Sequence, residues 1–324
     1  MTAHTASRGL GNGLSQRVKD PGFWAEWAAL VGLVVLVIVF QTLNPTFLSA
    51  GNVRSMLSAA AILIVLAVGQ TFVIATAGID LSIASAMTLS AVAFGQVFSR
   101  GAGLVPATIV AVATGTLVGL VNGLLISRAK ITDFIVTLGT LSAASGAALI
   151  LANGKPVTVI DATLLRLATG RVGIIGYSVV IAIVIAVLAH ILLFRTRFGT
   201  HVLATGGNAE AANATGVRTA RTKTAVYMLC GFLAGIASIL LVARVGAAEP
   251  AANTAFLLNS VAAVVLGGVS LFGGRATIIG PVIGALLLTA LVNGLTLLGV
   301  SQLYQPLSVG IVVVLAAFLT RFQK

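Results

Sequence analysis

Long runs of apolar residues, separated by short polar or glycine-rich stretches, dominate the chain from Phe23 onward. A helix needs about 20 mostly apolar residues to cross a bilayer, whereas the strands of a membrane barrel alternate apolar and polar residues. The runs are continuous, so they predict membrane-spanning helices. Ten spans are expected, at 24–43, 56–77, 82–98, 104–126, 131–152, 172–194, 223–243, 254–272, 276–297 and 303–320.

The composition supports this interpretation. Of the 324 residues, 58% are hydrophobic and only 8% are charged, which excludes a soluble enzyme and a disordered chain. We predict an all-α polytopic membrane protein with one transmembrane domain (23–324), preceded by a polar, basic tail (1–22). The third and eighth spans are rich in small polar residues and Gly, which also fits broken or re-entrant helices.

The charge distribution predicts how the chain is oriented. Lys and Arg number 19 against 7 Asp and Glu, a net charge of +12. In a soluble protein this would suggest nucleic acid, but in a membrane protein basic loops stay on the cytoplasmic side, so no nucleic acid is expected. With ten spans and a cytoplasmic N-terminus, 13 of the 19 basic residues fall inside and 6 outside. We therefore predict a multi-pass plasma membrane protein, embedded in lipid, with its N-terminus in the cytoplasm.

Signatures of catalysis are missing from the sequence. It contains no P-loop, no His-Glu-x-x-His pair and no Gly-x-Ser-x-Gly elbow. Its three histidines are scattered and Cys230 is its single cysteine, so neither a metal site nor an internal disulfide is expected. We predict that the chain is not an enzyme and binds no cofactor itself.

Polar residues within the spans are candidates for a translocation path or gate. For any one of them, bonding to a neighbouring helix is the commoner role, but as a set they suit a neutral, hydrogen-bonding solute. Only Asp80 and Asp133 are acidic and near membrane depth, which leaves open an ion-coupled carrier or channel that uses these two carboxylates. Both also fit helix capping. The candidate path residues are Gln70, Asp80, Ser82, Asn122, Asn259 and Asn293.

A weak internal repeat involves two of these candidates. Leu120-Val121-Asn122-Gly123 recurs as Leu291-Val292-Asn293-Gly294, each time late in a span. Four residues are a hint of the duplicated halves that transporters often have.

The inner loop at 195–223 is the most informative stretch. Asn208 suits a helix N-cap, Glu210 lies in the first turn and Gly216 fits a C-terminal stop, so a short Ala-rich helix is expected. A helix this short is marginal alone, so something must pack on it. Its partner is either anionic lipid, held by the flanking arginines, or a cytoplasmic protein. Because a pump without a P-loop needs such a partner, we favour the protein.

This loop resembles the coupling helix of the ribose-type permeases of ATP-binding-cassette (ABC) importers. Three further stretches are similar to the same family: Asn44–Ser49 with Asn52, Gly78–Ser82, and Gly267–Gly274 with Gly280 and Gly284. The chain departs from the family pattern at Ala77, Ala84 and Arg275-Ala276. The resemblance assigns the ATPase-coupling helix to Gly206, Gly207, Asn208, Glu210, Ala211, Ala212 and Gly216.

The resemblance also implies a function. A permease of this family carries a sugar, ribose-like or a related polyol, across the bacterial plasma (inner) membrane. The expected partners are a cytoplasmic ABC ATPase that uses ATP and Mg²⁺, an extracytoplasmic solute-binding protein, and a second permease subunit that forms a homodimer. The sugar itself is set largely by the solute-binding protein and cannot be read from this chain.

Overall fold

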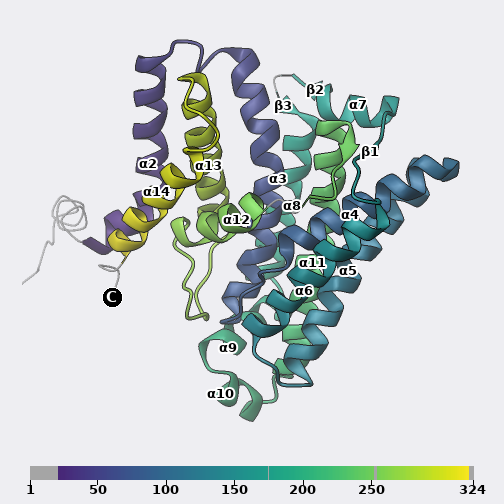
Figure 1. The fold of residues 1–324 in the computed structure, drawn as a ribbon. Coiled ribbons are helices and arrows are strands. Elements are labelled where there is room, and N and C mark those ends of the chain that lie inside the picture. The colour runs from purple at the N-terminus through teal and green to yellow at the C-terminus, as the bar shows by residue number, and fades with distance from the viewer. Residues whose placement is uncertain (1–20, 174, 252–253, 321–324) are drawn as a thin grey trace, which may run out of the picture.

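The computed structural model describes residues 21–173, 175–251 and 254–320 and shows a bundle of helices with four very short strands (Figure 1). The predicted tail 1–22 falls almost wholly outside the described residues. A helix lies at each of the ten expected spans, and the bounds of these helices are α2 (Pro21–Leu43), α3 (Ala50–Ala75), α4 (Ile83–Val97), α5 (Leu104–Ser127), α6 (Asp133–Leu151), α8 (Tyr177–Phe194), α11 (Thr219–Val245), α12 (Thr254–Leu266), α13 (Ile279–Leu297) and α14 (Gln305–Thr320).

Six helices among the described residues are long and apolar enough to cross a membrane: α3, α5, α6, α8, α11 and α13. The protein is therefore an all-α polytopic membrane protein, while the number of ten crossings stays a prediction. Helix α12 has only 13 residues, and α4 passes into a short π-helical turn, η1 (Phe98–Ala102).

The eighth predicted span is shorter in the structure than the apolar pattern suggested. Helix α12 ends at Leu266, and α13 begins at Ile279 rather than at 276. Gly268 has φ 76° and the Val269 N–H donates to the Val264 carbonyl (3.3 Å), so a left-handed glycine cap ends the helix. Apolar side chains continue past this point, which is why hydropathy alone misplaced the boundary.

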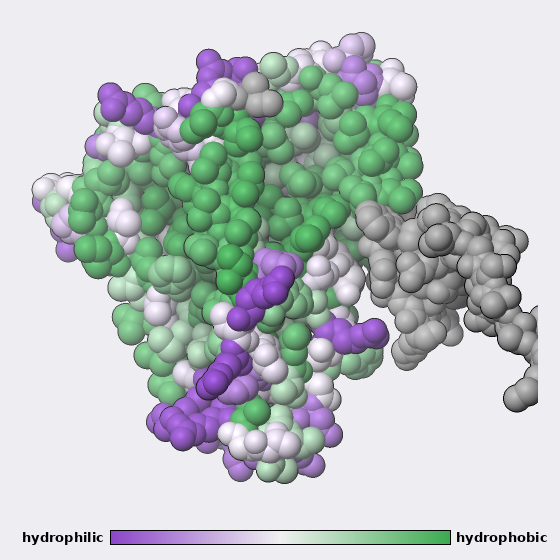
Figure 2. Space-filling model, turned by 180° about the vertical axis from the view of Figure 1, so that it is seen from behind, coloured by the Kyte–Doolittle hydropathy of each residue, from purple (hydrophilic) through white to green (hydrophobic). Residues whose placement is uncertain are grey.

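Small elements that the hydropathy pattern did not predict lie at the two ends of the bundle. At one end are α7 (Ala162–Thr169), β2 (Arg171–Val172) and β3 (Ile175–Gly176); near them, β1 (Val157–Thr158) pairs antiparallel with β4 (Ala247–Ala248). At the opposite end are α9 (Arg197–Gly207) and α10 (Ala209–Ala214) (Figure 1). The surface between the two ends is largely hydrophobic, and hydrophilic residues gather at both ends, including the α9–α10 end (Figure 2).

Helix α3 is the centre of the bundle. Every residue from 60 to 75 is buried, and the helix packs against α8, α11, α12 and α13. Beside it, α5 and α11 approach closely because glycines face each other. A Cβ on Gly119 would overlap the carbonyl oxygen of Tyr227, and one on Gly231 would overlap that of Gly115. Such small-residue contacts are how membrane helices pack without a hydrophobic driving force.

Candidate functional site

The short helix predicted after Asn208 is present as α10, whereas Gly206 and Gly207, which the resemblance also assigned to the coupling helix, are the last residues of α9. The Asn208 Oδ1 accepts a hydrogen bond from the Ala211 N–H (2.9 Å), and Glu210 lies in the first turn. Gly216 has φ 91°; its N–H and that of Val217 donate to the carbonyls of Asn213 (3.0 Å) and Ala212 (2.9 Å). This is a complete N-cap and a Schellman C-cap around a six-residue helix. The local structure is as predicted from sequence, whereas its role in coupling is a separate question.

The α3–α4 connection, residues 76–82, contains two of the candidate path residues and is tied to α5 and α6 by a chain of hydrogen bonds. The Thr140 hydroxyl donates to Asn122 Oδ1 (2.7 Å), the Asn122 amide donates to Ser82 Oγ (2.8 Å), and the Ser82 hydroxyl donates to Asp80 Oδ1 (2.6 Å). Gln70 Nε2 donates to the Asp80 carbonyl (3.3 Å). Asp80, Ser82, Asn122 and Gln70 are each at most 2% exposed.

Four of the six candidate path residues therefore come together, and in this conformation they bind one another. The expected capping of the next helix by Asp80 is wrong: α4 begins at Ile83 with Ser82 as its N-cap, and the Asp80 carboxylate accepts the N–H (2.8 Å) and hydroxyl of Ser82 instead. Because every donor in the chain points toward this buried carboxylate, the bonds reinforce one another.

The other two candidates lie elsewhere. Asn293 on α13 exchanges a reciprocal pair of hydrogen bonds with Asn52 near the start of α3 (2.8 and 2.9 Å). Asn259 is half-buried on α12. Of the six candidates, Gln70, Asp80, Ser82 and Asn122 therefore form one polar cluster, and Asn259 and Asn293 lie outside it. Contact of any of the six with a solute stays a prediction.

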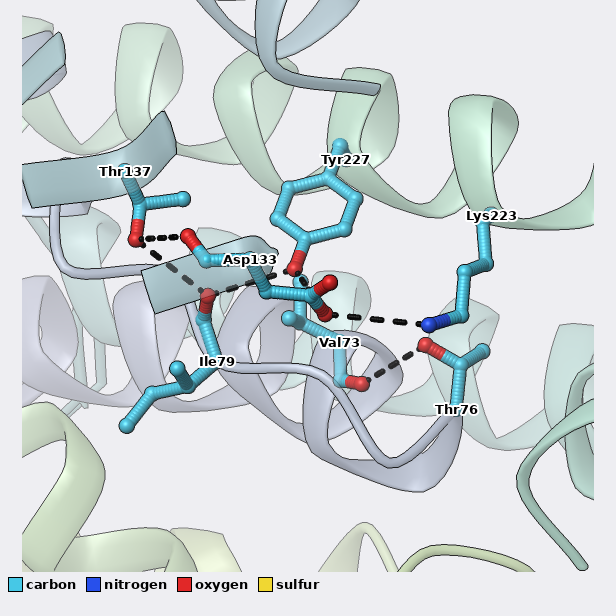
Figure 3. A network of polar contacts seen from close by, with 7 residues as sticks. All are labelled: Val73, Thr76, Ile79, Asp133, Thr137, Lys223 and Tyr227. Carbon is cyan, nitrogen blue, oxygen red and sulfur yellow. Dashed lines mark hydrogen bonds and ion pairs between the residues drawn. The ribbon is translucent and has the colours of Figure 1, made fainter. Parts of the chain in front are cut away.

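A second polar network holds the α3–α4 connection from the side of α6 and α11 (Figure 3). The Tyr227 hydroxyl lies 2.9 Å from Asp133 Oδ2 and 3.2 Å from the Ile79 carbonyl oxygen. The Lys223 Nζ lies 3.7 Å from the same Asp133 oxygen. The Thr137 hydroxyl donates to the Asp133 carbonyl (2.8 Å) and also lies 3.5 Å from that of Ile79.

Sequence reasoning identified Asp133 at the start of its helix but missed Lys223 and Tyr227. These two are four residues apart and so share one face of α11. That spacing was readable, but nothing in the sequence pairs that face with a carboxylate 94 residues away.

A third contact joins the α3–α4 connection to the helix that precedes α10. A Cβ on Gly206 would overlap the Ala75 carbonyl oxygen, and one on Gly273 would lie 2.7 Å from Ala77 N. The Gly274 N–H donates to the Ala75 carbonyl (3.0 Å). The end of α9, the end of α3 and the loop between α12 and α13 therefore meet backbone to backbone, without intervening side chains.

No group of three or more His, Cys, Asp or Glu that could hold a metal ion comes together within the described residues. The arrangement at this end is instead one of hydrogen bonds, one ion pair and close backbone contacts. Such an arrangement is suited to transmitting a displacement.

Comparison with known proteins identifies the class of protein. Residues 52–317 match the family described as the permease component of the branched-chain amino acid transport system, and the chain belongs to this family. No solved structure matches the chain.

Several curated relatives resemble nearly the whole chain. It is 39% identical over 308 residues to the ribose import permease protein RbsC of Bacillus subtilis, covering 94% of this chain and 96% of the relative. It is 35% identical over 295 residues to the L-arabinose ABC transporter permease protein AraH of Azospirillum brasilense, covering 90% and 87%. It is 30% identical over 301 residues to the D-allose transport system permease protein AlsC of Escherichia coli, covering 92% of each.

Proposed function

We propose that this chain is the membrane-spanning permease subunit of a bacterial ABC importer and that its substrate is a monosaccharide or a related polyol. The observation that carries the proposal is the similarity over 90% or more of the chain to permeases named for ribose, L-arabinose and D-allose. Because these relatives are named for three different sugars, the proposal is for a class of substrate rather than for one sugar.

The site supports a neutral solute. The buried polar groups near α3 are amides and hydroxyls, and the carboxylate among them, Asp80, is occupied by the Ser82 amide and hydroxyl. A charged substrate would need an opposite charge within the membrane, because apolar surroundings compensate charge poorly.

The proposal includes partners that supply what the chain lacks. A cytoplasmic ABC ATPase, which uses ATP and Mg²⁺, docks on α10; a solute-binding protein delivers the sugar outside; and a second copy of the chain completes the path. The protein lies in the bacterial inner membrane, with α9, α10 and the N-terminus on the cytoplasmic side.

Reconstitution tests the proposed function. Proteoliposomes that contain the permease, its ATPase and its solute-binding protein should accumulate radiolabelled ribose, arabinose or allose only when ATP reaches the ATPase. Uptake by the permease alone under an ion gradient would contradict the proposal. It would favour the alternative, an ion-coupled carrier that uses Asp80 or Asp133.

Deleting residues 208–216 tests the docking role of α10. The shortened protein should still insert into the membrane but should no longer co-purify with the ATPase, and transport should be lost. Normal co-purification would refute the assignment of α10 as the coupling helix.

A further inference from the structure

The segments on either side of α10 hold the α3–α4 connection between them. Gly206, two residues before Asn208, contacts the backbone of Ala75, while Tyr227, in the helix after α10, reaches the Ile79 carbonyl (3.2 Å). Lys223 lies only nine positions beyond the last residue of α10. Two short routes therefore lead from α10 to the α3–α4 connection, one through Ala75 directly before it and one through Ile79 within it.

The two routes differ in chemistry. The Gly206 route is a steric contact between backbones, which can push but bonds weakly. The Tyr227 route is polar and can also pull, because the Tyr227 hydroxyl is within hydrogen-bonding distance of both Asp133 Oδ2 and the Ile79 carbonyl oxygen (Figure 3).

Proton counting shows that this hydroxyl is shared. A tyrosine hydroxyl has one proton to donate, and both neighbouring oxygens are acceptors when Asp133 is ionised. Lys223 stands 3.7 Å from that carboxylate, beyond hydrogen-bond length but close enough to offset its charge. The more closely Lys223 neutralises Asp133, the more freely the Tyr227 proton can bind Ile79.

Gly78 shows that the chain leaves room for this network. A Cβ on Gly78 would lie 2.6 Å from Asp133 Oδ2 and 2.8 Å from the Tyr227 hydroxyl oxygen. The φ of Gly78 is not in the left-handed region, so close approach rather than backbone conformation requires glycine here.

We propose that Lys223, Tyr227 and Asp133 are coupling residues, which fasten the α3–α4 connection to the helix that follows α10 and so transmit the ATPase-driven displacement to the buried Asp80–Ser82–Asn122 chain. The proposal rests on the proposed function as an ABC permease. These residues touch neither nucleotide nor solute in this scheme; they position the segment that moves.

The test measures uptake and ATP hydrolysis together in proteoliposomes that contain the permease, its ATPase and its solute-binding protein. Tyr227→Phe removes only the hydroxyl. We expect it to lower the sugar transported per ATP hydrolysed by about fivefold, the size of one net hydrogen bond, while ATPase docking stays intact. Thr224→Val is the matched control on the same helix turn, since the Thr224 hydroxyl bonds Ser127 (2.8 Å) and the Gly123 carbonyl (3.3 Å) on α5 and not the connection. Its transport-to-ATP ratio should stay at the wild-type value.

Two further variants separate coupling from folding. Gly78→Ala should lower the same ratio without removing any polar group, because its methyl displaces Asp133 and Tyr227. Asp133→Lys should also lower it, and the exchange Asp133→Lys with Lys223→Asp should recover at least about half of the loss, since an ion pair is restored.

The outcomes are distinct from those that test the function itself. If the wild-type protein transports sugar but Tyr227→Phe and Gly78→Ala keep its transport-to-ATP ratio, the coupling proposal is wrong and the proposed function stands. A failure of the wild-type protein to transport sugar would instead contradict the proposed function. If all variants lose transport and ATP hydrolysis in equal proportion, with no rescue by charge exchange, the network is structural only and the proposal is overturned.

Discussion

The two copies of Leu-Val-Asn-Gly are used differently, although both fasten α3. In α5, Asn122 binds Ser82 beyond the C-terminal end of α3; in α13, Asn293 binds Asn52 near its N-terminal end. Asn122 is fully buried in a chain of donors that ends on the Asp80 carboxylate, whereas Asn293 is half-buried in a neutral amide pair. The glycine of each copy admits a neighbour: Thr224 of α11 lies against Gly123, and Phe40 of α2 lies against Gly294.

We infer from this difference that the C-terminal end of α3, near α10, is the end that would move during transport. The end near α10 has a charged, branched network with three independent contacts, while the other end has a simple anchor. In the proposed mechanism the ATPase acts on α10, and the contacts that would pass its movement on lie at this end of α3. The following substitutions test this contrast, beginning with the largest expected effect.

A comparison of Gly206→Ala with Gly207→Ala tests the backbone contact between α9 and the end of α3. A methyl at 206 overlaps the Ala75 backbone, whereas at 207 the nearest atom is Gly274 Cα at 3.9 Å. Neither the added Cβ nor the Ala75 carbonyl oxygen can rotate out of the way, because both are fixed by the backbone. We therefore expect Gly206→Ala to destabilise the protein by about 1–3 kcal/mol and to abolish most uptake. Gly207→Ala should be close to wild type in thermal unfolding in detergent and in uptake. Equal behaviour of the two variants would contradict the contact.

The variants Asn122→Ala and Asn293→Ala compare the asparagine contacts at the two ends of α3 directly. Removing the Asn122 amide leaves the buried Ser82 hydroxyl without its donor and the half-buried Thr140 hydroxyl without its acceptor, which should cost about 1–3 kcal/mol. Asn52 is half-buried and can bind water once Asn293 is truncated, so that variant should cost about 1 kcal/mol or less. Thermal unfolding of the purified variants measures both. A larger loss for Asn293→Ala would reverse our ranking of the two ends.

Ala77→Gly should give the smallest effect, and in the opposite direction. Ala77 has φ 56°, a left-handed conformation that costs a residue with a Cβ about 1 kcal/mol. The substitution should therefore raise stability by up to about 1 kcal/mol. Ala75→Gly, two residues earlier within α3, is the control and should lower it by about 1 kcal/mol. A fall in stability for both variants would show that the conformation at 77 carries no strain.

Much of the fold could be predicted from hydropathy, because each apolar run long enough to span a bilayer is a helix in the structure. The caps of α10 were also predictable, since Asn208 and Gly216 act through their own neighbours. The end of α12 and the helix α7 could not be placed, because glycine geometry and surface amphipathicity there are weaker signals than the hydropathy on either side.

The site was only partly predictable for a different reason. Asp80 and Ser82 are two residues apart, but their partner Asn122 is 40 residues away and Tyr227 is 94 residues from Asp133. Such pairings depend on how helices pack, which no local pattern records. The polar residues were therefore found as a set, while their division into a buried chain at one end of α3 and an amide pair at the other required the structure.

The most direct test of the central claim is whether residues 76–82 move with α10. Spin labels at positions 77, 105 and 210, all exposed, can be placed in pairs in a Cys230→Ala background, with the permease bound to its ATPase. Distances are then measured before and after trapping the ATPase with a non-hydrolysable ATP analogue. We predict that the 77–105 and 210–105 distances change together while the 77–210 distance stays constant. A change in the 210–105 distance without any change in the 77–105 distance would show that α10 moves alone, and would contradict the account.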